Sequence, residues 1–154
     1  FAMAPVHERA AGAAGLQVGT PHVLSLAPLL GALEVISGAG GVGALREKSL
    51  ALTSFLMEAG DARLTPFGFK VVTPRAAPAR GGHVALAHPE AWRICQALKA
   101  AGVVPDFRAP DLIRLAPSPL FTRFAECAEA VERLRGIVSS GEHLGFSAQP
   151  ARVT

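Results

Sequence analysis

The sequence lacks several features that would assign it to a particular class of protein. No apolar run is long enough to span a membrane, and no charged segment precedes an apolar one as in a secretory signal. We therefore expect no membrane association. The 15 basic residues are scattered and form no stripe with aromatic side chains, which argues against a nucleic-acid partner. Only two cysteines are present, and both fall on apolar faces of predicted helices, which favours reduced thiols in a cytoplasmic protein.

What the sequence does contain is the composition of a globular domain. Of the 154 residues, 50% are hydrophobic and 18% are charged, and this length is enough for one domain with a real core. We expect residues 1–20 to be an irregular segment, residues 21–140 to form a small domain with a joining helix, and residues 141–154 to be a tail. Because the irregular start has little to pack on, we expect the chain to be the C-terminal part of a longer protein.

The pattern of apolar residues predicts helices and strands in the order α–α–β–β–α–β–β–α. This order indicates an α/β fold of the α+β-like kind, with a small, mostly antiparallel sheet covered by helices on one face. Helices are expected over residues 21–37, 42–59, 89–101 and 122–140, and strands over residues 69–74, 82–88, 103–108 and 111–116.

The first predicted helix carries a candidate anion site at its start. Thr20 is a good N-cap and Pro21 a good first helical residue. The free backbone N–H groups and the helix dipole at such a start favour an anion, although the local pattern alone favours a capping threonine without a ligand. This helix is apolar nearly all round, so we expect it to be buried on most sides. Thr122 is expected to cap the last helix.

Two other motifs favour structural interpretations. The run GAGGVG, residues 38–43, matches a dinucleotide-binding pattern, but a helix precedes it where that motif needs a strand, which favours a turn between two helices. His83 and His88 lie on a predicted strand and at its end, and a metal site would need a further ligand. We therefore interpret them as ordinary histidines and expect no metal.

The segment PDLIRLAPSP raises the question of what its arginine binds. It is predicted as a short buried strand, and Arg114 in its middle needs an anionic partner, because burying an unpaired guanidinium is costly. The pattern leaves two possibilities level: an ion pair with Glu126 or Asp111, or a ligand carboxylate, which the two parallel donors of an arginine fork suit. Arg108 is expected to form a surface ion pair with the nearby Asp106.

Together, several runs of this sequence resemble the C-terminal part of the kynureninase family. They are LREKSLALT, RGGHV and, most specific of all, the spacing D-x-R-x-P-x-x-I-R-x-x-P-x-P-L. The resemblance extends from Phe1 to about Val138. It departs at Phe121, where the family usually has tyrosine, and this sequence has no tyrosine at all. The family belongs to the class V aminotransferase group of pyridoxal-phosphate enzymes, and the resemblance implies the small C-terminal domain of fold type I.

The resemblance also implies an activity and site residues. The whole enzyme would hydrolyse L-kynurenine or its 3-hydroxy derivative to an anthranilate and L-alanine, within tryptophan catabolism and NAD biosynthesis. It would be a homodimer with active sites at the subunit interface. Arg114 would bind the α-carboxylate of the substrate, and Thr20 would reach the cofactor phosphate or the substrate from the neighbouring subunit. Arg80 and Gly81 match a recurrent pair of the family that we interpret as structural.

By the same resemblance, the lysine that holds pyridoxal phosphate belongs to an N-terminal cofactor domain missing from this sequence. Lys48, Lys70 and Lys99 do not match it, so the chain alone is expected to be inactive, with no catalytic residue of its own. Two alternatives stay open: another class V enzyme, such as a transaminase or desulfurase, and a non-catalytic α/β interaction module. Buried positions for Cys95 and Cys127 count against a desulfurase, and the all-apolar first helix counts against a free-standing module.

Overall fold

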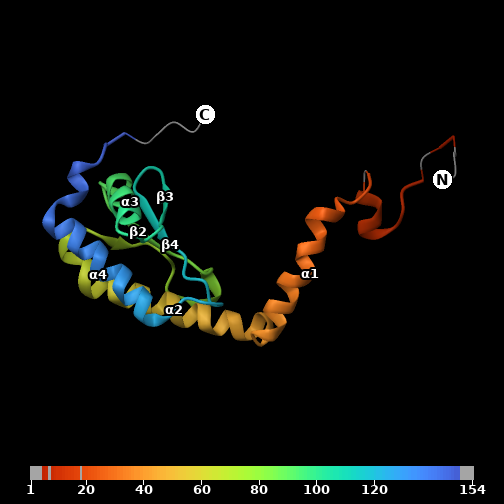
Figure 1. Ribbon diagram of the computed structural model, residues 1–154, viewed down its shortest axis with the longest axis horizontal. Helices are drawn as coiled ribbons and strands as arrows, with labels where there is room; N and C mark the ends of the chain where they lie inside the picture. The colour runs from red at the N-terminus through yellow and green to blue at the C-terminus, as the bar shows by residue number, and fades with distance from the viewer. Residues whose placement is uncertain (1–4, 7, 18, 150–154) are drawn as a thin grey trace.

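The computed structural model describes residues 5–6, 8–17 and 19–149. The expected chain start at Phe1 and the last residues of the expected tail lie outside the described residues. Figure 1 shows a compact body from which one helix extends as an arm towards the N-terminus. The expected division of the chain into residues 1–20, 21–140 and 141–154 stays a prediction.

The predicted order of helices and strands is confirmed within the described residues. The α-helices are α1 (Val23–Gly38), α2 (Gly41–Leu64), α3 (Ala91–Ala100) and α4 (Phe124–Ser140). The strands are β1 (Lys70–Val71), β2 (Val84–Ala87), β3 (Asp106–Arg108) and β4 (Leu112–Leu115). Short 3₁₀ helices are η1 (Gly12–Leu16), η2 (Thr65–Phe67), η3 (Ala77–Ala79) and η4 (Glu142–Gly145).

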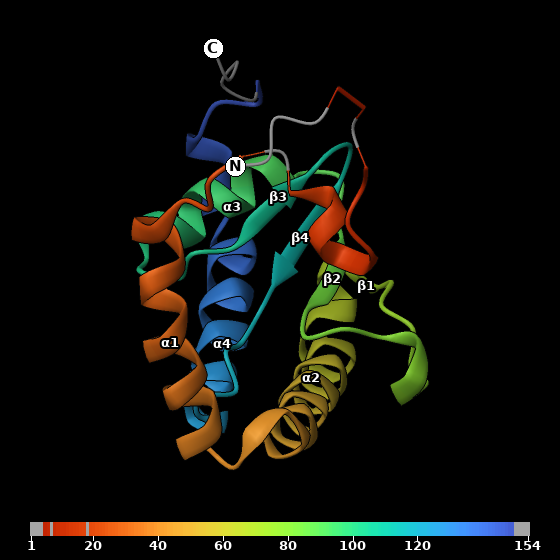
Figure 2. The same ribbon diagram turned by 90° about the vertical axis from the view of Figure 1, so that its right-hand side faces the viewer.

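The strands form one antiparallel sheet in the order β1-β2-β4-β3, which confirms the predicted fold class. Helix α2 contacts β1 and β2, and α3 contacts β3 and β4. In the view from the side of α1, the strands lie in front of α3 and α4 (Figure 2). Helices α2, α3 and α4 therefore lie on one face of the sheet (Figure 2), as the sequence pattern predicts.

The core lies between that face and the helices. On α3 the spacing Ala91, Ile94, Cys95 and Leu98 places four apolar side chains on one stripe, and all of them are fully buried. A similar helical period on α4 buries a second stripe, formed by Cys127, Val131, Leu134 and Ile137, and α4 packs against α2. Residues 142–145, expected to be irregular, form η4, and the side chain of His143 within it is buried.

Both predicted threonine caps are wrong. Helix α1 begins at Val23 with His22 as its N-cap, and the His22 carbonyl accepts the first helical hydrogen bonds. The ring Nδ1 of His22 also lies 2.8 Å from the Ser25 hydroxyl. The N-cap of helix α4 is Arg123 and not Thr122, and the Glu126 carboxylate accepts the N–H of Arg123 at 2.8 Å and closes the first turn.

Helix α1 is not buried, contrary to the expectation from its apolar surface. None of its residues is buried by the described part of the chain, and it meets α2 across a turn in which Gly40 has φ +89°. The GAGGVG run is thus a turn between helices, as interpreted. No single helix of the described residues is long and apolar enough to cross a membrane, although α1 and Gly41–Phe67 together, bent by 69°, pass that test of length and composition.

Candidate functional site

Arg114 lies in β4, with β2 on one side and β3 on the other. The register sets it opposite Ala85 on β2 and Asp106 on β3. Because side chains alternate along a strand, Ile113 and Leu115 face the core, whereas Arg114 lies on the open face of the sheet. The strand is therefore buried on one face only, and the side chain of Arg114 on the other face is 30% exposed.

The partner of Arg114 is Asp106, and not Glu126 or Asp111. The Nε of Arg114 donates to Oδ2 of Asp106 at 2.8 Å, and its Nη2 donates to the same oxygen. The predicted pair of Arg108 with Asp106 is confirmed, with a distance of 2.9 Å from Nε to that oxygen. The structure thus brings together two arginines and one aspartate on the open face.

Sequence reasoning missed the pairing of Asp106 with Arg114, although a signal for it was present. Residues 109–111 connect β3 to β4, and so short a connection pairs residues that are symmetric about Pro110. Asp106 and Arg114 are such a pair. The carboxylate therefore lies on the same face as the guanidinium.

The electrostatic balance of this face favours a further anion. The hydrogen bond from Arg114 holds the pKa of Asp106 below its ordinary value, and Arg108 acts in the same direction. Asp106 is consequently ionised at neutral pH. Two guanidinium groups share this single carboxylate, so one positive charge of the cluster is left uncompensated. A carboxylate ligand suits that charge, because an arginine fork donates two parallel hydrogen bonds to it.

Thr20, the other predicted site residue, is exposed and lies two residues before the N-cap of α1. The segment that precedes α1 lies at the far end of the arm, away from the sheet (Figure 1). The structure therefore does not bring Thr20 and Arg114 of the same chain together.

Arg80 fastens the loop between β1 and β2 to α2, in agreement with its structural interpretation. Its guanidinium donates to the Leu50 carbonyl at 3.2 Å and to the Ser54 hydroxyl at 2.6 Å. Arg46, within the LREKSLALT run, donates at 2.8 Å to the carbonyl of Arg80. At Gly82 an added Cβ would lie 3.2 Å from the Ser49 hydroxyl, which explains why this position of the RGGHV run suits glycine.

The lysines of this chain do not lie in a groove suited to the covalent attachment of pyridoxal phosphate. Lys70 and Lys99 are exposed, and Lys48 is half-buried on α2. Three grooves of the described residues lie beside α4, one of them with a volume of about 140 Å³ and walls that include Leu115 and Cys127. No lysine lines these grooves in the described part of the chain.

The cysteines are free and buried, and they are poor nucleophiles. Burial raises the pKa of the Cys95 thiol to about 12, and it also raises the pKa of Cys127. Both thiols are therefore protonated at neutral pH, whereas nucleophilic cysteine chemistry needs a thiolate. The described residues contain no group of three or more His, Cys, Asp or Glu side chains that could hold a metal ion.

Comparisons with known proteins agree with the sequence motifs. The family model described as kynureninase C-terminal domain matches residues 45–134. Kynureninases of Geobacillus thermodenitrificans and Bacillus anthracis are 46% and 48% identical to this chain over 135 and 134 residues. A kynureninase of Shouchella clausii is 40% identical over 134 residues. These alignments cover 87% or 88% of this chain, which spans only 31% of the length of each relative. Because the family model matches more than half of it, the chain belongs to the kynureninase C-terminal domain family.

Proposed function

We propose that this chain is the C-terminal part of a kynureninase. That enzyme is a pyridoxal-phosphate-dependent hydrolase that converts L-kynurenine or 3-hydroxykynurenine to L-alanine and anthranilate or 3-hydroxyanthranilate. The observation that carries the proposal is the family match together with the uncompensated positive charge at Arg114. Because the chain spans 31% of the length of its relatives, the proposal includes an N-terminal cofactor domain, without which the chain is inactive.

In this proposal Arg114 binds the α-carboxylate of the substrate amino acid. Asp106 contacts its Nε and Nη2, so the edge formed by Nη1 and the second Nη2 hydrogen is left for a carboxylate. Two parallel hydrogen bonds at that edge would fix the orientation of the substrate about its Cα. Bound pyridoxal phosphate supplies an electron sink for the removal of a proton from the substrate Cα.

The proposal assigns Thr20 and α1 to contacts outside this chain. Thr20 reaches the cofactor phosphate or the substrate of the neighbouring subunit in a homodimer, which agrees with the place of the segment before α1 at the far end of the arm (Figure 1). Helix α1 is covered by the cofactor domain or the second subunit. Its exposed leucines and valines support this role, because apolar surface of that extent marks an interface.

The alternatives have less support. A cysteine desulfurase needs an accessible thiolate, and Cys95 and Cys127 are buried with raised pKa values. A free-standing interaction module gives no reason for the arginine cluster on the open face of the sheet. Free, buried thiols also support a reducing location, and we infer that the enzyme acts in the cytoplasm.

The test of this proposal is Arg114→Ala in the full-length enzyme. We expect kcat/KM for L-kynurenine to fall at least about a hundredfold, since charged hydrogen bonds contribute roughly 1.5–3 kcal/mol each. Arg114→Lys should not restore activity, because lysine keeps the charge and lacks the fork. Both variants should fold and retain pyridoxal phosphate, as followed by cofactor absorbance.

A matched control is Arg135→Ala, which removes an arginine paired at 2.8 Å with Glu132 on α4, away from the open face. It should leave kcat/KM within about twofold, because an exposed ion pair contributes roughly 0–1 kcal/mol. If Arg114→Ala lowers the melting temperature and leaves kcat/KM within a few-fold, Arg114 is a structural residue and the assignment is wrong.

A further inference from the structure

Asp106 contacts the Nε and Nη2 edge of the Arg114 guanidinium, which leaves the opposite edge for a ligand. Both donors, Nε and Nη2, meet the same oxygen, Oδ2. An arginine carries five N–H donors in a fixed planar fork, so this contact leaves the opposite edge available. The pair thus resembles a guanidinium held from one side so that it faces a ligand with the other.

The sheet fixes this arrangement from both neighbouring strands. Asp106 and Arg114 are cross-strand partners in β3 and β4, so their separation is set by the register of the hairpin. On the other side, β2 places Ala85 opposite Arg114. Ala85 has no side-chain group that competes for the guanidinium and is only 8% exposed. Of the two cross-strand neighbours of Arg114, Asp106 is therefore the one whose side chain can fix the orientation of the guanidinium.

We propose that Asp106 is a positioning residue that holds the Arg114 guanidinium in the orientation that receives the substrate carboxylate. This inference rests on the proposed function, in which Arg114 binds that carboxylate. A free arginine side chain has many rotamers, and binding is weaker when the ligand itself must select one of them. Asp106 restricts the rotamers before the ligand arrives.

Arg108 prevents Asp106 from cancelling the charge that the ligand needs. An aspartate paired with one arginine would leave a neutral pair with little attraction for an anion. Here Arg108 donates to the same Oδ2 at 2.9 Å, so the three-residue cluster keeps a net positive charge. Asp106 can thus orient Arg114 without neutralising the site.

The test uses the full-length enzyme with pyridoxal phosphate. Asp106→Ala should raise KM for L-kynurenine about tenfold and change kcat by less than about threefold, because it loosens binding rather than the chemical step. Asp106→Asn retains an acceptor oxygen and should show a smaller increase in KM, and it replaces the alanine variant if that variant does not fold. Asp61→Ala is a matched control: Asp61 is as exposed as Asp106 and pairs with an arginine at 2.7 Å. It should leave KM unchanged.

Two further measurements separate positioning from a purely structural role. The first is the dissociation constant of L-alaninamide divided by that of L-alanine, a ratio that reports recognition of the carboxylate and should fall about tenfold in Asp106→Ala. The second is the double variant of Asp106→Ala with Arg114→Ala, which should be no worse than Arg114→Ala alone, because the aspartate acts through the arginine. If Asp106 had only a structural role, Asp106→Ala would instead lower the stability of the enzyme and leave the ratio unchanged. The loss of activity in the double variant would then be the sum of the losses in the two single variants.

The possible failures are distinguishable. If Arg114→Ala has a large effect and Asp106→Ala leaves both KM and the ratio within twofold, the positioning role is overturned and the proposed function stands. A lower KM in Asp106→Ala or Asp106→Asn also overturns it, since Asp106 would then compete with the substrate. If Arg114→Ala itself has little effect on kcat/KM, both the positioning role of Asp106 and the assignment of Arg114 to the substrate carboxylate fail.

Discussion

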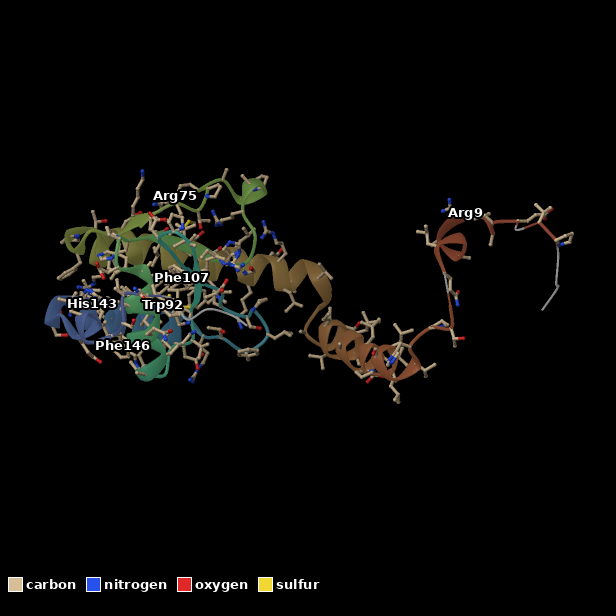
Figure 3. The ribbon with its side chains drawn as sticks, turned by 90° about the horizontal axis from the view of Figure 1, so that it is seen from above. Arg9, Arg75, Trp92, Phe107, His143 and Phe146 are labelled. Carbon is tan, nitrogen blue, oxygen red and sulfur yellow. The ribbon has the colours of Figure 1, made fainter. Side chains whose placement is uncertain are left out.

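The arm α1 and the compact domain use apolar residues in opposite ways. On α3 the apolar residues form one stripe, and the side chain of Leu98 is 0% exposed. On α1 they surround the helix, and Leu24 is 83% exposed. Figure 3 shows the labelled side chains of Trp92 and His143 within the compact body, whereas Arg9 lies beyond the far end of α1. The apolar stripe of α3 is thus buried against other elements of this chain. The all-round apolar surface of α1 needs a covering surface that the described residues do not supply.

The largest expected effect is on the assembly of the chain. The 154-residue chain by itself should self-associate through α1, because the exposed leucines and valines of α1 form an uncovered apolar surface. Replacing Leu24 and Leu30 together by glutamate should give a monomer in sedimentation velocity. Val104→Glu is the control, since Val104 is also 83% exposed but lies outside the arm, and it should leave the association unchanged. If the unsubstituted chain is a monomer, the apolar surface of α1 does not need a partner, and the contrast drawn between α1 and the compact domain is wrong.

Two leucine substitutions compare the regions directly. Leu98→Ala should lower the free energy of unfolding by about 2–5 kcal/mol, because it removes packed methyl groups and leaves a cavity. Leu24→Ala should change the free energy of unfolding of the monomer by less than about 0.5 kcal/mol, because its side chain is 83% exposed in the described part of the chain. Urea unfolding followed by circular dichroism measures both values. Equal losses would mean that α1 is packed in the isolated chain.

Within the domain, Arg80→Ala should destabilise by about 1–3 kcal/mol. The substitution leaves acceptors on α2, including the Leu50 carbonyl, without the guanidinium that they contact. Arg75→Ala, which removes an exposed pair with Asp61, should cost less than about 1 kcal/mol. If thermal unfolding shows the same loss for both arginines, the loop is not fastened by Arg80.

A smaller effect should appear as a pH dependence confined to the domain. His88 accepts the Glu90 N–H at Nδ1 and lies 3.1 Å from the Phe67 carbonyl through Nε2, which suits the neutral ring. Burial lowers its pKa below 6.5 and outweighs the hydrogen bond with the Phe67 carbonyl, which raises it; the nearby His143 lowers the pKa further, and Glu90 raises it slightly. The unfolded chain therefore binds this proton more readily, and stability should fall as the pH drops below about 6.5.

Urea unfolding between pH 7.5 and pH 5.5 measures this dependence above the range in which ordinary carboxyl groups titrate. His88→Gln should reduce the slope of stability against pH. His22→Gln, at the exposed start of α1, should leave it unchanged. An identical slope in the His88 variant would assign the proton uptake to another group.

The smallest expected effect is that of Thr20→Val on stability. A lost N-cap typically costs about 1 kcal/mol, but α1 begins after His22 and Thr20 makes no cap. We therefore expect the free energy of unfolding of the chain to change by less than about 0.3 kcal/mol. In the full-length enzyme the same substitution should weaken retention of pyridoxal phosphate, as measured by dialysis. Unchanged retention would remove Thr20 from the proposed site.

Local patterns in the sequence were sufficient to predict the order of the elements, the antiparallel sheet and the α3 stripe. Each depends on the spacing of residues that are close along the chain, such as Ile94 and Leu98, and the helical period alone places these on one face. The motifs around Arg46, Arg80 and Arg114 also indicated the family without any tertiary contact, because their spacing is specific. Periodicity also indicated that α1 is apolar all round.

Only the tertiary structure decided the partners of these residues. Asp106 and Arg114 meet because the hairpin register joins two strands, and a shift of one residue would have placed them on opposite faces. His143 is buried because η4 packs against α3, which no local pattern in its glycine-containing segment indicates. The exposure of α1 has the same origin, since burial depends on what lies next to a helix in space. The sequence thus determined which surfaces are apolar or charged, and long-range packing determined which of them are matched within this chain.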